Sequence, residues 1–464
     1  MIKRGFNLKK ITVFLLCALL VLSLAACGNG GGFEAPDTPD TSDTPHTPDT
    51  SDNSASGENN TAGKDKENSQ QLDEIAKLER KYMNLSTDDL KWEYNSAAKT
   101  IVISGKGPMK DYAGAPAEWD IYSSEAEKVV IGEDVTSIGS CAFLWFSAIT
   151  EVKLGASVEF VGEAAFSNCD ALCTVNFPSN LKYVGDSAFN NDLLHSENGF
   201  SFPEGMLFIG AGAFRSAFKE NKVSIPASLS LIGDGAFANM FVSAFIVDTN
   251  NPSYASVDGV LYDKGITTLI NYPADKRDTL FEIPNTVTTI RKDAIEVTNT
   301  LEKIVIPASV SSIEEGAIFW NYALSYIDVD ADNNCYKSED GVLFTKDGKK
   351  MLCYPIASDR TEYTVPDGTE RICNYAMSQA RSLTELYTSE GLREIGDTGL
   401  YLCDNLKTLS LPGSLTSVEA KALTFCDSLT EIRYAGTSAD WKKVSIGKGN
   451  ELLTDGSVRI YCAE

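Results

Sequence analysis

The strongest constraint on the fold is a sequence unit that recurs ten times along the chain. Seven of the nine steps between successive units are 23 or 25 residues long, and the other two, of 58 and 59 residues, contain insertions. A fixed period of this length is typical of a solenoid, in which each unit forms one coil and stacks on its neighbours. The units begin at Val135, Val158, Leu181, Met206, Leu229, Val287, Val310, Thr369, Leu392 and Leu415.

Three positions of the unit keep the same kind of residue. The fourth is always isoleucine or valine, the eighth is alanine in nine units and Gly399 in the tenth, and the ninth is large and apolar, as in Phe143 and Leu423. Alanine lets neighbouring segments approach closely, while the larger side chain fills the interior. Because no unit can bury these residues alone, the units are expected to be stable only as a series.

Each unit also contains a short segment of alternating apolar residues, such as Leu172 to Pro178 and Leu406 to Pro412. This alternation predicts a strand with every second side chain facing inward. The proline ends the strand because it has no N–H to donate. We therefore predict a β-rich solenoid, with strands of successive coils about 4.8 Å apart and joined by short turns or helices.

The full unit, Val-x-x-Ile-Gly-x-x-Ala-Phe-x-x-Cys-x-x-Leu-x-x-Ile-x-Ile-Pro, resembles the BspA-like class of leucine-rich repeats over residues 135–434. The resemblance extends to the flanks, which look like an N-terminal β cap following a short helix in 71–134 and a C-terminal cap in 435–464. It implies a leucine-rich-repeat fold and a role in adhesion, because some relatives attach to extracellular matrix proteins. The segments that resemble the caps are Leu90-Lys91-Trp92, residues 100–109, residues 436–441 and the strand ending at Tyr461.

The two long steps contain insertions that match each other, near residues 248–280 and 330–362. Asp258-Gly259 in the first and Asp340-Gly341 in the second are each followed by alternating apolar residues. An Asp-Gly pair in this setting predicts a β-hairpin. Such hairpins are common in the family that the chain resembles.

The N-terminus has the pattern of a secretion signal with a lipid attachment site. Its first ten residues carry four positive charges, and the uncharged apolar run from Ile11 to Ala26 is shorter than the ~20 residues of a membrane span. Leu24-Ala25-Ala26-Cys27-Gly28 resembles the lipobox of bacterial lipoproteins. We therefore predict a signal peptide over 1–27, lipid on Cys27 and a location at the bacterial cell surface or the outer face of a membrane.

Residues 28–70 are rich in proline, threonine, aspartate and serine. They contain too few apolar residues to offset the entropy of ordering, which predicts a disordered acidic tether. In the following residues, 71–85, the apolar positions Leu72, Ile75, Leu78, Tyr82 and Leu85 have helical spacing. Packing against the core explains this stripe better than membrane contact does.

The charge and histidine content narrow the possible functions. The chain has a net charge of −25. The first ten residues contribute +4 and residues 34–70 contribute −7, so residues 71–464 carry −22. A body this acidic repels phosphate backbones, so we expect no nucleic-acid partner. The only histidines are His46 and His195, which makes a histidine-based zinc or catalytic site improbable on the sequence.

Two further patterns allow a chemical interpretation. Asp328, Asp330, Asp332 and Glu339 have the spacing of an EF-hand calcium loop, but Asn333 occupies the position of the sharp glycine turn and no helices flank the segment. We expect neither a metal nor any other cofactor there.

Nine cysteines follow Cys27. Two of them, Cys403 and Cys426, occupy the twelfth position of adjacent coils, where they could form one disulfide or remain free thiols.

Residues on the outward positions of the strands form the candidate binding surface, since the inward positions are occupied by packing. We expect a lipid-anchored surface protein without catalytic residues that adheres to extracellular proteins of a host or a neighbouring cell. The alternatives are a structural or glycan- or peptide-capturing surface protein and, in third place, an enzyme that uses carboxylates. The candidate surface residues are Phe245, Tyr326, Asp328, Glu385, Tyr387 and Arg433.

Overall fold

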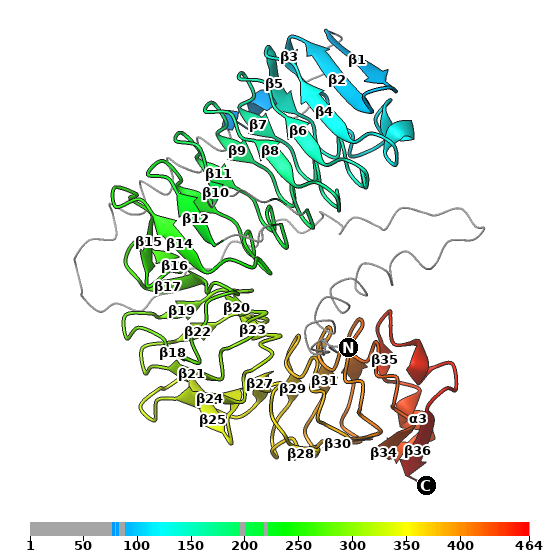
Figure 1. The fold of residues 1–464 in the computed structure, drawn as a ribbon. Coiled ribbons are helices and arrows are strands. Elements are labelled where there is room, and N and C mark those ends of the chain that lie inside the picture. The colour runs from blue at the N-terminus through cyan, green and yellow to red at the C-terminus, as the bar shows by residue number, and fades with distance from the viewer. Residues whose placement is uncertain are drawn as a thin grey trace, which may run out of the picture. The chain divides into compact units, whose positions relative to one another are not determined.

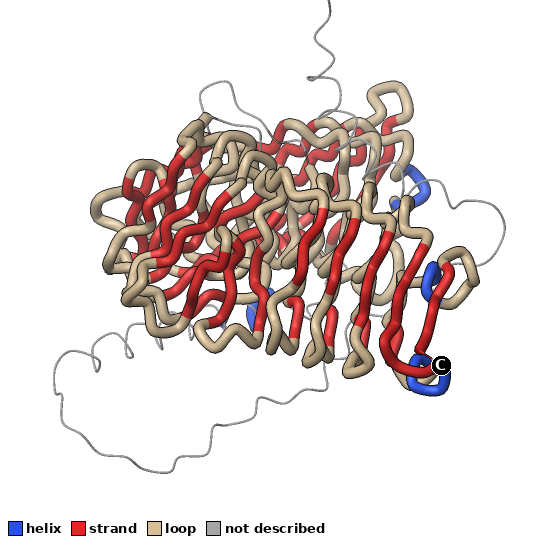
Figure 2. Tube along the Cα trace, turned by 90° about the horizontal axis from the view of Figure 1, so that it is seen from below, coloured by secondary structure: helices blue, strands red, loops and turns tan. Residues whose placement is uncertain are grey.

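Each repeat forms one coil, because its alternating apolar segments become strands and its Ala-Phe segment becomes a turn. The computed structural model describes residues 77–78, 80–82, 89–192, 194, 200–217 and 221–463. Within the unit 61–464, the coils stack in chain order, so that strands of successive coils lie side by side (Figures 1 and 2). The predicted β-rich solenoid is confirmed. Of the two predicted kinds of connection between strands, short turns or short helices, the described repeats have turns.

The first wall of the stack, the long-strand wall, consists of parallel strands in four separate sheets. Along these strands buried and exposed residues alternate, as the sequence predicted. Its strands are β2 (Thr100–Gly105), β4 (Lys128–Ile131), β6 (Glu151–Lys153), β8 (Thr174–Asn176), β10 (Phe200–Ser201), β12 (Lys222–Ile225), β14 (Ala244–Val247), β18 (Leu280–Glu282), β21 (Lys303–Ile306), β24 (Tyr326–Val329), β28 (Glu362–Thr364), β30 (Glu385–Tyr387), β32 (Thr408–Leu411), β34 (Glu431–Thr437) and β36 (Arg459–Ala463).

The second wall, the short-strand wall, is built around the conserved fourth position of the repeat. Ile138 pairs with Val161 and Val161 with Val184, which brings these side chains into one buried row. Its strands are β3 (Gly107–Pro108), β5 (Val135–Ile138), β7 (Phe160–Val161), β9 (Tyr183–Val184), β11 (Phe208–Ile209), β13 (Leu231–Ile232), β19 (Thr289–Ile290), β22 (Ser312–Ile313), β29 (Arg371–Ile372), β31 (Glu394–Ile395), β33 (Ser417–Val418) and β35 (Ser445–Ile446).

The third wall, the turn wall, comprises residues 141–147 and their equivalents in the other coils. The N–H groups of Cys141, Phe143 and Trp145 donate to carbonyls of the next coil at 2.8, 2.8 and 3.0 Å, so this wall also pairs coil to coil. The seventh and eleventh positions of all ten repeats have positive φ. One parallel strand pairing reinforces this wall, between β20 (Ile295–Glu296) and β23 (Ile318–Phe319).

The core is the space that the three walls enclose. The ninth-position rings stack coil on coil, with centroids 5.2 Å apart between Phe143 and Phe166 and 5.4 Å apart between Phe166 and Phe189. The eighth-position alanines are buried next to them. The columns read from the sequence are therefore the interior of the stack.

At the ends of the stack the pairing changes. Strand β1 (Leu90–Asn95) pairs antiparallel with β2, and β36 follows β34 as the last strand of its sheet. A four-residue helix, α3 (Ser438–Trp441), lies between these last two strands in the chain. The two 3₁₀ turns are η1 (Asp120–Tyr122) and η2 (Glu451–Leu453).

Part of the helix predicted over 71–85 is described, at residues 77–78 and 80–82. Leu78 and Tyr82 are buried against Phe160 and Tyr183 on the outside of the short-strand wall. The ring of Tyr82 stacks on Phe160 with centroids 5.3 Å apart. This contact agrees with the prediction that the stripe packs against the protein.

Each insertion contains an antiparallel hairpin across its Asp-Gly pair, as predicted, and a third strand that joins the short-strand wall. Strands of the first insertion are β15 (Tyr254–Val257), β16 (Val260–Asp263) and β17 (Thr268–Asn271). Those of the second are β25 (Tyr336–Glu339), β26 (Val342–Thr345) and β27 (Lys350–Cys353).

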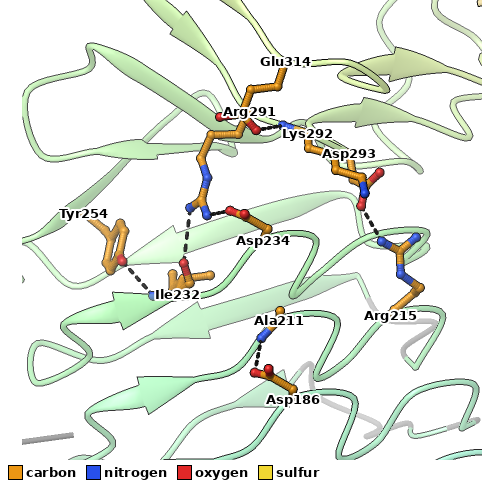
Figure 3. A network of polar contacts seen from close by, with 10 residues as sticks. All are labelled: Asp186, Ala211, Arg215, Ile232, Asp234, Tyr254, Arg291, Lys292, Asp293 and Glu314. Atoms are coloured by element: carbon orange, nitrogen blue, oxygen red, sulfur yellow. Dashed lines mark hydrogen bonds and ion pairs between the residues drawn. The ribbon is translucent and has the colours of Figure 1, made fainter. Parts of the chain in front are cut away.

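At the first insertion, the sheet of the short-strand wall ends and no further described strand pairs with its last member. Side chains form hydrogen bonds to its backbone instead (Figure 3). The last strand of this sheet, β13, ends at Ile232, whose N–H donates to the Tyr254 hydroxyl at 2.8 Å. The Ile232 carbonyl accepts a hydrogen bond from Arg291 at 3.2 Å. Arg291 also pairs with Asp234, and Arg215 with the buried Asp293. The second insertion repeats the first contact, since the N–H of Ile313 donates to the Tyr336 hydroxyl at 2.7 Å.

We predict that Tyr254→Phe lowers the free energy of unfolding by about 1–3 kcal/mol, because the buried N–H of Ile232 loses its acceptor. Tyr272→Phe is the matched control, since the buried Tyr272 hydroxyl has no hydrogen-bond partner among the described residues. Urea unfolding of the two variants measures the difference. Equal stability of both variants would contradict the role given to the Tyr254 hydroxyl.

Candidate binding surface

Three of the predicted surface residues lie together on the sheet formed by β28, β30, β32, β34 and β36. Glu385 and Tyr387 point outward from β30, on either side of the buried Leu386, and Arg433 points outward from β34. Tyr387 and Arg433 share one row, because both pair with Ser410 of the intervening strand. The alternation of β-strand side chains thus brings an aromatic ring, a carboxylate and a guanidinium to one face.

Hydrogen bonds between neighbouring outward side chains order this face. The Tyr387 hydroxyl donates to Glu385, and the Nε of Arg433 lies 2.5 Å from a carboxylate oxygen of Glu431. The first contact raises the pKa of Tyr387, and the second raises the pKa of Arg433, because each stabilises the protonated form. These side chains are therefore held in place although solvent reaches them.

Tyr326 and Asp328 also face outward, but in a different sheet, with β18 and β21. Lys303 on the neighbouring strand contacts both of them. Its ammonium lies 2.9 Å from the Asp328 carboxylate and 5.4 Å from the centroid of the Tyr326 ring, which is 42% exposed. The structure therefore divides the predicted surface into two patches.

The prediction that Phe245 faces outward is wrong. Its side chain is 1% exposed, and it pairs with the inward Val223 of β12. Three consecutive apolar residues, Phe245 to Val247, left the alternation ambiguous in the sequence. The outward residue of this strand is Ile246, which is 45% exposed.

Sequence reasoning missed Tyr461, which is 51% exposed on β36 and pairs with Arg433. It extends the row of Tyr387, Ser410 and Arg433 by one strand. β36 follows the last repeat, so no column of the repeat marks Tyr461 as outward. The period-two alternation of β36 itself is the signal that could have found it.

The carboxylates with EF-hand spacing are used in other contacts. Asp328 pairs with Lys303, an oxygen of Asp330 accepts the N–H of Asp332 at 2.8 Å, and Glu339 pairs with Lys337. In the described part of the chain, no three His, Cys, Asp or Glu side chains form a group that could hold a metal ion.

The cysteines of the twelfth position are free thiols in the core. The Sγ of each thiol donates to a backbone carbonyl of the preceding coil: Cys169 to Phe143 at 3.2 Å, Cys403 to Met377 at 3.3 Å and Cys426 to Leu400 at 3.1 Å. Burial raises the pKa of the Cys169 thiol. These contacts make the thiols part of the packing.

Several sequence predictions concern residues outside the described ranges, namely Cys27, the tether over 28–70, His46 and His195. None of the helices in the described part of the chain has the length and apolar character that crossing a membrane requires.

Comparison with known proteins identifies the repeat. A model of the BspA type leucine-rich repeat region matches in six copies, over residues 121–244, 276–344 and 354–444, which is more than half of the chain. A sequence search of the curated proteins found no match.

One solved structure of a bacterial leucine-rich-repeat protein is similar in fold, and two further bacterial structures match over most of their length. A leucine-rich repeat protein from Eubacterium ventriosum is 22% identical, with a TM-score of 0.51, and the match covers 78% of this chain and 92% of that one. A leucine rich cell surface protein from Faecalibacterium prausnitzii is 21% identical, with a TM-score of 0.45 and coverage of 78% and 97%. The pneumococcal vaccine antigen PcpA is 17% identical, with a TM-score of 0.29 and coverage of 82% and 98%.

We predict that Phe245→Ala lowers the free energy of unfolding by about 3–5 kcal/mol, the cost of removing a buried aromatic ring. Ile246→Ala, one residue along the same strand, should change it by less than ~0.5 kcal/mol, as expected for an exposed side chain. Chemical denaturation of both variants gives the comparison. A larger loss for Ile246→Ala would reverse the assignment of the two faces of β14.

Proposed function

Because this chain belongs to the BspA-type leucine-rich-repeat family, we propose that it is a bacterial surface protein that adheres to extracellular proteins through its long-strand wall. The observation that carries the proposal is the row of Tyr387, Ser410, Arg433 and Tyr461 beside Glu385 on one sheet. Tyrosine and arginine are the residue types that most often dominate the energy of protein interfaces.

The physical argument rests on what the fold leaves available. Inward side chains such as Leu386 and Ile432 are fully buried and cannot contact a partner. The outward ones can vary without altering the core, because the side chains of a strand alternate between its two faces. The net charge of −22 over residues 71–464 favours a protein partner with basic surface and disfavours nucleic acid.

Two alternatives remain alongside adhesion. A surface protein that is structural or captures glycans or peptides would use the same wall, and the experiment below separates it from an adhesin. A carboxylate-based enzyme would need a pair of acids such as Glu394 and Glu419. Arg371 pairs with both, at 3.0 and 3.5 Å, which favours a structural ion network over proton transfer.

We predict that the combined variant Glu385→Ala, Tyr387→Ala and Arg433→Ala binds its extracellular partner at least about tenfold more weakly. The measurement is binding of the full chain to a panel of purified extracellular matrix proteins and a panel of glycans. Lys222→Ala with Ser224→Ala removes outward side chains of β12 instead and should leave binding unchanged.

Equal binding by the two variants would contradict the assignment of this sheet as the adhesive face. Binding to glycans alone would favour the capturing alternative. Turnover of a substrate that is lost on Glu394→Gln would favour the enzyme.

We also propose that a lipid on Cys27 anchors the protein to the membrane, as the lipobox-like sequence indicates. Two or more acyl chains hold a protein durably at a bilayer, each buried CH₂ contributing about 0.8 kcal/mol. We predict that Cys27→Ala moves the protein from the detergent phase to the aqueous phase in detergent partitioning of expressing cells. Retention of the variant in the detergent phase would refute lipid anchoring at this residue.

A further inference from the structure

The eleventh position of the repeat has positive φ in every coil, yet its residue type changes along the stack. Asparagine, which tolerates this conformation, occupies it in three coils, at Asn168, Asn191 and Asn239. Large apolar residues, for which positive φ is strained, occupy it in five coils. These are Trp145, Val297, Trp320, Leu402 and Phe425.

The fold itself does not need a large residue at this position. Where the residue is asparagine, it makes a contact along the wall, as between Asn191 and Asn168 at 2.7 Å. Val297 is buried, so packing offsets its strain. Phe425 is 39% exposed, so burial offsets much less of the backbone strain at this residue. An exposed ring in a strained conformation points to a role outside folding, and in the described part of the chain Phe425, unlike the exposed Trp145, also contacts a ring of another coil.

Phe425 belongs to a row of aromatic rings on the turn wall, which come from the coils beginning at Val310, Leu392 and Leu415. Its ring centroid lies 5.4 Å from that of Tyr401, which lies 6.2 Å from that of Trp320. Tyr322, two residues after Trp320, is 37% exposed. We call Trp320, Tyr322, Tyr401 and Phe425 the aromatic stripe.

Charged side chains of the thirteenth position accompany the stripe. Arg381 lies over the Tyr322 ring, 5.9 Å from its centroid, so a guanidinium already contacts one ring of this wall. The next two coils present the exposed carboxylates of Asp404 and Asp427 at the same position. Ring faces and carboxylates both attract cations.

We propose that the aromatic stripe is a second binding surface, which takes arginine or lysine side chains of a basic polypeptide segment. It lies on the turn wall and is separate from the long-strand wall of the proposed adhesive face. Burial raises the pKa of the Tyr401 hydroxyl, the nearby Asp404 carboxylate raises it further, and Asp427 lies on the same wall one coil further. These carboxylates and the acidic body favour a cationic segment over a neutral glycan. The rings supply stacking, and Asp404 and Asp427 supply the charge.

The test measures binding of a fluorescent nona-arginine peptide to the full chain by anisotropy, with a nona-glutamine peptide as the neutral probe. Phe425→Asn removes the ring without changing the net charge, and it introduces the residue that three other coils have at this position. We expect binding about three- to fivefold weaker, with a melting temperature no lower than that of the wild type.

Trp145→Asn is the matched control, because it makes the same kind of change in the same column, outside the stripe, at a residue that is 59% exposed. It should bind the peptide as the wild type does. A second pair keeps the test independent of the ring: Asp427→Asn should weaken binding, and Asp170→Asn, at the same position of another coil, should not.

Equal affinities for the two asparagine variants of the eleventh position, or equal losses for the two aspartate variants, would overturn the proposal and leave only diffuse attraction between opposite charges. Loss of glycan binding by Phe425→Asn, with peptide binding intact, would also overturn it. Either result leaves the adhesive role of the long-strand wall untouched.

Discussion

The structure depends on the hydrogen bonds and apolar contacts that each coil makes with the next. A single coil has only two short strands and a turn, and its inner side chains would remain exposed without neighbours. Pairing along all three walls joins the coils, as the turn-wall contact from Phe143 N–H to the Ala165 carbonyl illustrates. The stacked rings of Phe143, Phe166 and Phe189 fill the space that this pairing encloses.

The insertions show what happens where this pairing is interrupted. The strand before each insertion would present unpaired backbone groups, which are costly when buried. The hydroxyls of Tyr254 and Tyr336 accept the N–H groups of Ile232 and Ile313, respectively. The same solution appears twice, which fits the matching sequences of the two insertions.

Most of the core was predictable from the sequence, because burial repeats at fixed positions: the isoleucine and valine column, the alanines and the large ninth residues are all interior. The hairpins followed from Asp258-Gly259 and Asp340-Gly341. The sequence prediction placed Phe245 on the outward face, because the apolar residues next to it made the alternation ambiguous. The positive φ values at the eleventh position were not predictable, because residues as different as Asn168 and Phe425 adopt them.

The candidate site was predictable only in part. Alternation alone placed Glu385, Tyr387 and Arg433 outward, but their presence in one sheet, apart from Tyr326 and Asp328, depends on where the insertions divide the wall. Tyr461 and the aromatic stripe involve contacts between residues of different coils. Such contacts depend on how the coils stack, and the residue types along the sequence do not reveal them.

The division of the long-strand wall limits the width of any continuous binding surface on it. The carbonyls of Gly259 and Gly341, at the hairpin tips, accept the N–H groups of Phe245 and Ile327, so each tip sits against the last strand before the break. The five strands from β28 to β36 span roughly 20 Å at a spacing of about 4.8 Å. A binding surface of this width suits an extended peptide segment or one exposed loop of a larger molecule.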